Sequence, residues 1–318
     1  MSGISVQEST TGSSLQDRLQ QAMNSVNSIL LGKERQVELA FSCLLARGHL
    51  LIEDLPGVGK TTLAHALATV IGAHYQRIQF TSDLLPADIL GVSIYRRDRE
   101  EFEFHPGPIF SELILADEVN RATPKSQSAL LEAMAEGQVT IESTTHGLPD
   151  PFFVIATQNP LDLVGTFPLP DSQLDRFLLS LTLGFPDPKV ERELLTAEDR
   201  SKVLVKTSAA MSTADVQALQ EQCQRLHASE ALLDYIQALL AETRNSRWFE
   251  TGLSPRAGIA LLHCGKALAF INGRDFVTSE DIKRVFPALA RHRMTVPHGM
   301  EVTVEEQLTS LLNQVAIP

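Results

Sequence analysis

The sequence is poor in cysteine: only Cys43, Cys223 and Cys264 carry a thiol among its 318 residues. The three are scattered without the C-x-x-C spacing that is typical of zinc sites and redox motifs. Three isolated thiols in a chain of this length do not make a disulfide framework either. We interpret them as reduced structural thiols and expect the protein to be cytoplasmic.

Long apolar runs are also absent. No stretch reaches the roughly 20 apolar residues that cross a bilayer, so we expect no membrane span. The first residues, MSGISVQESTTGSS, are polar and have neither the basic nor the apolar region of a signal peptide. We predict a flexible N-terminal tail over residues 1–14.

Basic residues are outnumbered, with 27 Lys and Arg against 39 Asp and Glu and a formal net charge of −12. General affinity for nucleic acid needs a basic surface that displaces counterions from the phosphates. The acidic balance therefore disfavours a nucleic-acid partner. The 43% of apolar residues is enough for one large globular domain or two smaller ones.

The most informative segment present is residues 49–62, HLLIEDLPGVGKTT, followed by the amphipathic stretch LAHALATVI. This order predicts a strand, a Gly-rich loop and a helix. Such a loop presents backbone N–H groups to phosphates, with Lys60 on the β- and γ-phosphates and Thr61 on Mg²⁺. The segment predicts a nucleoside triphosphate site made by Pro56, Gly57, Val58, Gly59, Lys60, Thr61 and Thr62.

One position departs from the pattern G-x-x-x-x-G-K-[ST], because Asp54 stands where the first glycine is expected. Gly57 and Gly59 still supply tight turns and an approach free of side chains. A dinucleotide-binding loop is disfavoured, since the third glycine of that motif is missing and Lys60 intrudes. The remaining alternative is an ordinary glycine turn before a helix. The acidic strand end at Asp117 and Glu118, described below, argues against that alternative.

Unbroken apolar runs alternate with helical stretches in the first part of the chain. Helical spacing predicts two helices within residues 15–48, separated by a turn at Gly32, and another helix from Pro124 to Glu136. Alternating segments predict exposed hairpins at 93–104 and around QVTIES and HGLPDP. The whole indicates an α/β fold with a parallel sheet sandwiched by helices. Besides the strand before the Gly-rich loop, we expect strands at 75–80, 112–117, 152–159 and 177–185.

The character of the sequence changes at Pro186-Asp187-Pro188, which we interpret as a domain boundary. We predict an α/β core over residues 15–186 and a helical domain over residues 187–318, with Pro186–Pro188 as a hinge. Beyond the boundary we find no convincing strand. The expected helices are about 189–199, 213–226, 230–245, 255–270 and 279–292.

Polar side chains follow the predicted strands, where ligands bind in parallel sheets. Asp117 ends the buried run LILAD and would hold the metal, and Glu118 would act as general base on an attacking water. Asn159 ends FFVIATQN and would orient that water or contact the γ-phosphate. The structural alternatives are an acidic helix cap for the Asp-Glu pair and a turn former for Asn159.

Hydrolysis also needs positive charge on the γ-phosphate beyond Lys60 and Mg²⁺. Arg176, in DSQLDRFLL, and Arg256, in GLSPRAGIALL, are the candidates, and Arg121 is a third. Sequence order alone leaves open which of them reach the nucleotide.

These segments together resemble the AAA+ ATPases, and specifically the MoxR family, over almost the whole chain from Gly32 to Arg293. The family's own phosphate loop has the form E-D-x-P-G-x-G-K-T, so Asp54 belongs to its pattern. The segments that carry the resemblance, in order, are GHLLIEDLPGVGKTTLA, FTSDLLPADILG, GPIFSELILADEVNRATPKSQSALLEAMAEGQVTI, VIATQNP, LPDSQLDRFLL and LSPRAGIALL.

The resemblance implies a P-loop NTPase fold with a small all-α lid, and ATP and Mg²⁺ as ligands. It implies Walker A at Lys60 and Thr61, Walker B at Asp117 and Glu118, and sensor 1 at Asn159. By the same resemblance, Arg176 matches the arginine finger offered to a neighbouring subunit. Arg256 matches sensor 2 on the lid, which we expect to clamp the nucleotide of its own subunit. The hairpin at 93–104 is similar to the helix-2 insert of this clade, and 137–150 to its pre-sensor-1 insertion.

The resemblance further implies a homo-oligomeric ring, typically a hexamer, that remodels protein clients together with partners carrying a von Willebrand factor A domain. Expected activities are complex assembly, enzyme activation and metal insertion. Tyr95, Arg96, Arg97, Phe102 and Phe104 of the first hairpin are candidates to contact a client, and a solvated surface hairpin is the alternative. The competing functions are a nucleic-acid-translocating AAA+ motor and a nucleotide-binding scaffold without turnover.

Overall fold

The computed structural model describes residues 14–161, 164–196, 200–297 and 302–317. Apart from Ser14, the predicted N-terminal tail lies outside the described residues. Among the described residues, no helix combines the length and apolarity needed to cross a bilayer.

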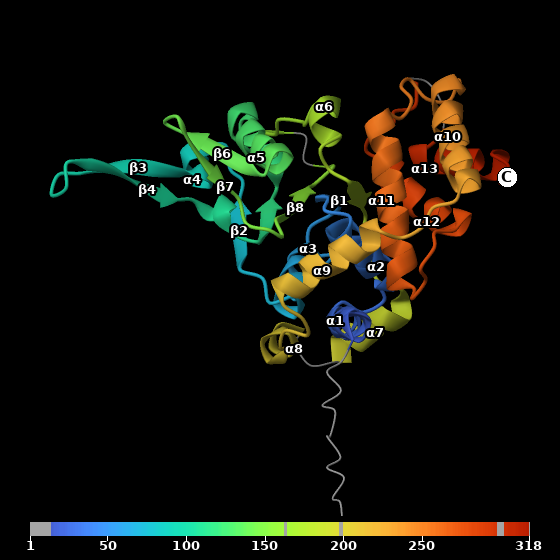
Figure 1. The fold of residues 1–318 in the computed structure, drawn as a ribbon, viewed down its shortest axis with the longest axis horizontal. Helices are drawn as coiled ribbons and strands as arrows, with labels where there is room; N and C mark the ends of the chain where they lie inside the picture. Colours follow the sequence, from blue (N-terminus) through green and yellow to red (C-terminus); the bar gives the residue numbers. More distant parts are fainter. Residues whose placement is uncertain (1–13, 162–163, 197–199, 298–301, 318) are drawn as a thin grey trace, which may run out of the picture.

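A five-stranded parallel sheet forms the centre of the molecule (Figure 1). Successive side chains point to opposite faces of a strand, so Leu50 and Ile52 pack on one face while Leu51 packs on the other. Four of the five strands are buried on both faces, as the unbroken apolar runs predict, whereas the edge strand over residues 75–79 buries only Ile78. The strands, in their spatial order, are β2 (Tyr75–Gln79), β5 (Leu113–Asp117), β8 (Phe153–Gln158), β1 (Leu50–Glu53) and β9 (Leu179–Leu181).

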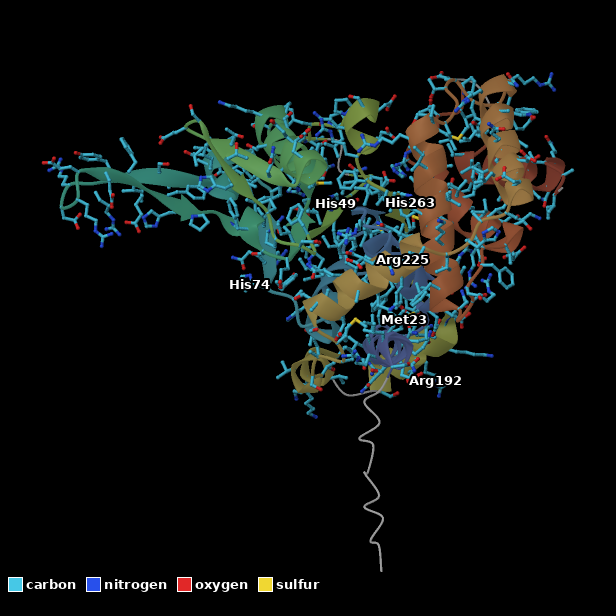
Figure 2. All side chains as sticks on the ribbon, viewed as in Figure 1. Met23, His49, His74, Arg192, Arg225 and His263 are labelled. Carbon is cyan, nitrogen blue, oxygen red and sulfur yellow. The ribbon has the colours of Figure 1, made fainter. Side chains whose placement is uncertain are left out.

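Helices cover the two faces of the sheet, which confirms the α/β prediction. One core contains apolar residues of α1 (Leu15–Ile29), α2 (Glu34–Leu45) and α3 (Lys60–Val70). A second core lies on the other face under α4 (Pro86–Leu90) and α5 (Pro124–Glu136). Figure 2 shows the side chains that fill these layers, with His49 at the sheet and Met23 on α1.

The last strand is shorter than predicted. Only Leu179–Leu181 pair with β1, so the expected strand over 177–185 was too long. Before it, Phe177 N donates to the Leu174 carbonyl in the turn that follows α6 (Asp171–Leu174). After it, the amides of Leu183 and Gly184 donate to a side chain in the phosphate loop and not to a strand.

Two antiparallel hairpins form separate two-stranded sheets beside the central one. The longer, β3 (Gly91–Arg96) with β4 (Glu101–Pro106), projects far from the body (Figure 1). Gly91 has φ +100°, and an added Cβ would lie 2.3 Å from the His105 carbonyl oxygen, so this base of the hairpin requires glycine. The second hairpin pairs β6 (Gln138–Ile141) with β7 (Thr144–Gly147), and its return strand lies earlier than the predicted HGLPDP segment.

Among the described residues after 186 the regular elements are helices, as predicted, and the buried apolar side chains of these helices share one core with those of α1–α3. The long helix α11 packs against α2 as well as against its neighbours α9, α10 and α12. Sequence reasoning missed α8, which is only seven residues long, and α13. The helices are α7 (Pro188–Thr196), α8 (Arg200–Lys206), α9 (Thr213–Gln224), α10 (Glu230–Asn245), α11 (Pro255–Ile271), α12 (Ser279–Ala290) and α13 (Val304–Gln314).

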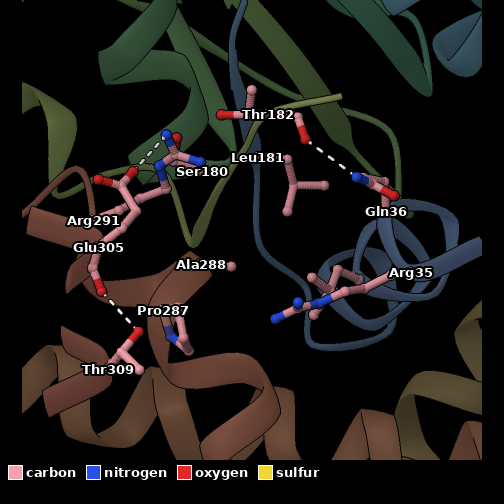
Figure 3. A pocket seen from close by; sticks show the side chains of 11 residues that line it. Arg35, Gln36, Ser180, Leu181, Thr182, Pro287, Ala288, Arg291, Glu305 and Thr309 are labelled. Atoms are coloured by element: carbon pink, nitrogen blue, oxygen red, sulfur yellow. Dashed lines mark hydrogen bonds and ion pairs between the residues drawn. The ribbon is translucent and has the colours of Figure 1, made fainter. Parts of the chain in front are cut away.

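A cavity of about 310 Å³ lies where α12 and α13 meet the edge strand β9 and helix α2 (Figure 3). On its core side, Gln36 Nε2 donates to the Thr182 carbonyl at 3.3 Å. On its helical side, Arg291 and Glu305 form an ion pair of 3.0 Å. These contacts join the edge of the sheet to the C-terminal helices.

Candidate functional site

The phosphate loop has the backbone that its sequence predicts. It leaves β1 at Glu53 and enters α3 at Lys60. Gly59 is the N-cap of α3 with φ +102°, a left-handed conformation that glycine adopts without strain. Lys60 Nζ donates to the Asp54 carbonyl oxygen at 2.6 Å, which holds its side chain over the loop.

Asp54 ties this loop to the end of the last strand. Its Oδ2 accepts from Leu183 N at 2.6 Å and from Gly184 N at 2.7 Å, and its Oδ1 accepts from Leu55 N. The carboxylate is buried, so these N–H partners stabilise its charge. Asp54, which replaces the first glycine of the general pattern, therefore connects the phosphate loop to residues 183–184.

Asp117 is the last residue of β5. It lies where the parallel strands end, on the same side of the sheet as the phosphate loop, and we call this side the carboxyl-end edge. Its Oδ1 accepts from Thr157 Oγ1 at 2.6 Å, and its Oδ2 forms an ion pair of 2.6 Å with Arg77 Nη2. Arg77 lies on β2, the strand beside β5. The carboxylate is thus held from both neighbouring strands.

Glu118 follows directly and has φ +59°, an uncommon conformation for a residue with a side chain. Its backbone N–H donates to Thr157 Oγ1 at 2.9 Å, so one hydroxyl contacts both acids of the pair. Its Oε2 accepts from Gln79 Nε2 at 2.9 Å and lies 3.0 Å from Arg121 Nε. Backbone strain of this kind occurs where surrounding contacts fix the geometry of a functional group.

Asn159 comes one residue after β8, is buried, and belongs to the same edge. Its Oδ1 accepts from Leu161 N at 3.1 Å, which is the turn-forming contact that the Asn-Pro sequence allows. The structure therefore brings Lys60, Thr61, Asp117, Glu118 and Asn159 together at the carboxyl ends of the strands.

Three residues at this edge were missed from the sequence: Arg77, Gln79 and Thr157. Arg77 and Gln79 are two apart on β2 and so point the same way, toward the acids at the end of β5. Thr157 is two residues before Asn159 on the neighbouring strand β8. The sequence signal for Arg77 and Gln79 is their spacing of two residues, which puts both side chains on one face of the strand. It indicates a contact with the acids only once β2 is known to lie beside β5.

The oxygen donors at this edge suit Mg²⁺, which prefers hydroxyl and carboxylate oxygens and takes few protein ligands beside a bound phosphate. Thr61 is exposed in the first turn of α3, and Asp117 ends the strand β5. The donor chemistry of these two residues fits the predicted metal. Among the described residues, no cluster of three His, Cys, Asp or Glu side chains offers another metal site.

Arg176 lies at the opposite side of the sheet, where the parallel strands begin, which we call the amino-end edge. It precedes β9, and the neighbouring Leu178 N donates to the carbonyl of His49, the residue before β1. The phosphate loop follows the other end of β1, a strand of four residues that spans about 13 Å. Arg176 Nη1 donates to the Leu131 carbonyl of α5 at 2.6 Å.

Arg256 lies at the same amino-end edge. It is exposed at the start of α11 and close enough to Arg293 that its charge helps to lower the pKa of that buried guanidinium, although burial is the larger cause. Arg293 in turn donates to the carbonyls of Phe177 and Leu178. Arg176 and Arg256 therefore share one edge, away from the phosphate loop of their own chain.

Comparison with known proteins shows which family has this architecture. Residues 49–179 match the family described as "ATPase family associated with various cellular activities (AAA)", and residues 241–311 match the AAA lid domain. Chaperone MoxR1 of Mycobacterium tuberculosis is 39% identical over 94% of this chain and 82% of its own length. The chain belongs to the MoxR family of AAA+ ATPases. This confirms the family predicted from the motifs.

Two further comparisons extend over both the core and the lid. The uncharacterized protein YeaC of Bacillus subtilis is 45% identical over 94% of this chain and 95% of its own length. A solved structure from Cytophaga hutchinsonii superposes with a TM-score of 0.88 at 35% identity, and the match covers 96% of both chains. ATP binding follows from membership of the family.

Proposed function

We propose that this MoxR-family protein hydrolyses ATP as a ring of identical subunits and uses the energy to remodel protein complexes. The observation that carries the proposal is the division of its charged groups between two edges of the sheet. Lys60 and the acids Asp117 and Glu118 lie at one edge, whereas Arg176 and Arg256 lie at the other.

This division supports a site shared between subunits. A four-residue strand separates the two edges by about 13 Å, so Arg176 does not reach the phosphate loop of its own chain. Head-to-tail packing sets the amino-end edge of one subunit against the carboxyl-end edge of the next, and repeated contacts of this kind close into a ring. A hexamer is the number of subunits that we propose.

The carboxyl-end edge has the groups that hydrolysis requires. Gln79 and Arg121 hold the Glu118 carboxylate, which we assign as the general base for the attacking water. We assign Asn159 to orienting that water and Pro56–Thr62 to binding the triphosphate. Mg²⁺ held by Thr61 and Asp117 would neutralise charge on the phosphates. Arg176 of the neighbouring subunit would add positive charge to the γ-phosphate. The family resemblance predicts that Arg256 acts on the nucleotide of its own subunit, but because it lies near Arg293 and the segment of Arg176, we assign it to the neighbour's nucleotide as well.

The β3–β4 hairpin is the part that we propose to contact a protein client. Tyr95 and Phe102 face each other across the strands with ring centroids 5.2 Å apart, and Phe102 is 65% exposed. Exposed paired aromatics far from the body offer apolar contact area of the kind that protein interfaces use. A partner with a von Willebrand factor A domain belongs to the same proposal.

The limits of the domains stay predictions, with a core over 15–186, a lid over 187–318 and a hinge at Pro186–Pro188. A cytoplasmic location is also proposed, and it is supported by three free cysteines that are all buried.

The test is the variant Glu118→Gln. It should bind ATP with unchanged affinity, lose hydrolysis by about 10²–10⁴-fold, and retain a client that the wild-type protein releases. An unchanged rate of phosphate release would show that the assigned mechanism is wrong. Hydrolysis that is stimulated by DNA and falls steeply with salt would instead favour the nucleic-acid motor.

A further inference from the structure

Arg293 is a buried cation that the mechanism above does not use. It stands in the turn that follows α12, and its side chain is only 7% exposed. Burying a charge costs free energy unless the group is paired and hydrogen-bonded, so its surroundings should explain why it is there.

All five N–H groups of the guanidinium have acceptors. Nε donates to Asp175 Oδ1 at 2.6 Å, which also makes an ion pair. Nη2 donates to the carbonyls of Phe177 at 2.6 Å and Asp175 at 3.3 Å. Nη1 donates to the carbonyl of Leu178 at 3.1 Å and to that of Leu289 in α12. An arginine side chain has no further donor to give.

Four of these five hydrogen bonds reach residues 175–178, the segment that contains Arg176. They hold the backbone on both sides of that residue, at Asp175 before it and at Phe177 and Leu178 after it. His292 adds a contact of 3.0 Å from Nε2 to the same Phe177 carbonyl. The end of α12 and the segment around Arg176 are thus joined as one unit.

We propose that Arg293 is a positioning residue for Arg176, and that it makes the position of the arginine finger depend on the helical lid. The proposal rests on the trans-acting role of Arg176 given above. The planar guanidinium reaches four acceptors on one segment, a pattern that a lysine ammonium with three donors does not reproduce. A movement of α12 would therefore displace the backbone on both sides of Arg176.

The experiment uses mixed rings, in which the two halves of a shared site come from different subunits. Lys60→Ala subunits still supply Arg176, and Arg176→Ala subunits still supply a phosphate loop, so mixing them restores hydrolysis at hybrid interfaces. Arg293→Lys is then added either to the Lys60→Ala subunit, which donates the finger, or to the Arg176→Ala subunit, which accepts it.

We expect Arg293→Lys to lower the restored rate by about 10²-fold in the donor, since a displacement of about 1 Å has that effect on a catalytic group. In the acceptor it should leave the restored rate unchanged, because the finger of that subunit is already removed. Arg291→Lys is the matched control. It lies two residues away, pairs with Glu305 in the cavity of Figure 3, and should be silent in both positions.

Equal loss in donor and acceptor would overturn the proposal, because general destabilisation of the fold acts in both. Hydrogen exchange gives a second readout: Arg293→Lys should speed exchange at residues 175–178 and leave the phosphate loop unchanged, and unaltered exchange at 175–178 would also overturn it. If the parent pair shows no restored hydrolysis although the subunits co-assemble, the trans role of Arg176 is wrong and the positioning role falls with it.

Should Arg293→Lys fail to fold, Asp175→Asn replaces it. This variant keeps an oxygen beside Nε and removes only the negative charge. The same donor-specific loss, at a smaller size, supports the proposal, and its absence contradicts it.

Discussion

The two edges of the sheet are built in different ways. At the carboxyl-end edge, Arg77 and Thr157 of the adjacent strands fix Asp117, and Asp54 joins the phosphate loop to the residues that follow β9. At the amino-end edge, Arg176 is held by a carbonyl of α5 and by the turn after α12. The first arrangement is made by contacts within the α/β core, whereas part of the second exists only when the helical part packs against the core.

The largest expected effect separates the edges directly. Arg176→Ala should lower the rate of hydrolysis by about 10³–10⁵-fold and leave ATP affinity nearly unchanged, since the arginine acts on charge that develops in the transition state. Steady-state hydrolysis and binding of a fluorescent nucleotide measure the two quantities.

Arg121→Ala is the matched comparison, because Arg121 lies beside Glu118 of its own chain. Mixing with Lys60→Ala should restore hydrolysis to Arg176→Ala but not to Arg121→Ala, whose defect lies in the same half-site as that of Lys60→Ala. Restored hydrolysis with Arg121→Ala would make it the trans-acting residue and would erase the distinction between the edges.

A smaller effect is expected from Thr157→Val, which removes the hydroxyl shared by Asp117 and the Glu118 backbone but keeps the shape of the side chain. Loss of such a supporting contact lowers metal affinity or activity by about 10–100-fold. Titration with Mg²⁺ and measurement of hydrolysis should both shift, while subunits that carry Thr157→Val still donate a working finger in mixed rings. Impaired donation would mean that the edges are not independent.

Acid should weaken the amino-end edge first, because both buried histidines of the described residues lie there. Burial lowers the pKa of His49 to about 4, and burial with the nearby Arg293 charge lowers that of His292 to about 3, both from 6.5. The unfolded chain therefore binds more protons below pH 6.5. Full stability is present above that pH and is lost as the pH falls toward the folded values, by up to about 1.4 kcal/mol per pH unit for each histidine.

Thermal unfolding between pH 7.5 and 5 measures this slope. His292→Gln keeps a donor for the Phe177 carbonyl but does not titrate, so it should flatten the profile. A slope that persists unchanged would assign the acid sensitivity to other groups.

The smallest effect on the fold is expected from Phe102→Ala on the β3–β4 hairpin. Its side chain is largely exposed, so the free energy of unfolding should change by less than about 0.5 kcal/mol. Basal hydrolysis should also be unaltered, while capture of a client by the Glu118→Gln form falls. Capture at full strength would return the hairpin to the alternative of a solvated surface.

The same contrast decides what sequence could predict. Lys60, Asp117 and Asn159 follow apolar strands, and parallel strands end at one edge, so their meeting was predictable from local pattern. The edge of Arg176 and Arg256 was not, because it depends on contacts between residues over a hundred positions apart, such as Arg293 with Asp175. Arg77, Gln79 and Thr157 were missed because strand order decides which acids they contact.

Asp54 has a consequence for anyone who would repair this motif by its letters. Asp54→Gly would match the general phosphate-loop pattern better, yet it deletes the carboxylate that accepts from Leu183 N and Gly184 N. Leaving a buried N–H group without its acceptor costs about 1–3 kcal/mol. Consensus engineering at this position would therefore remove the hydrogen bonds that connect the phosphate loop to residues 183–184, which lead into the helical part. A sequence closer to the general pattern would give a less stable protein.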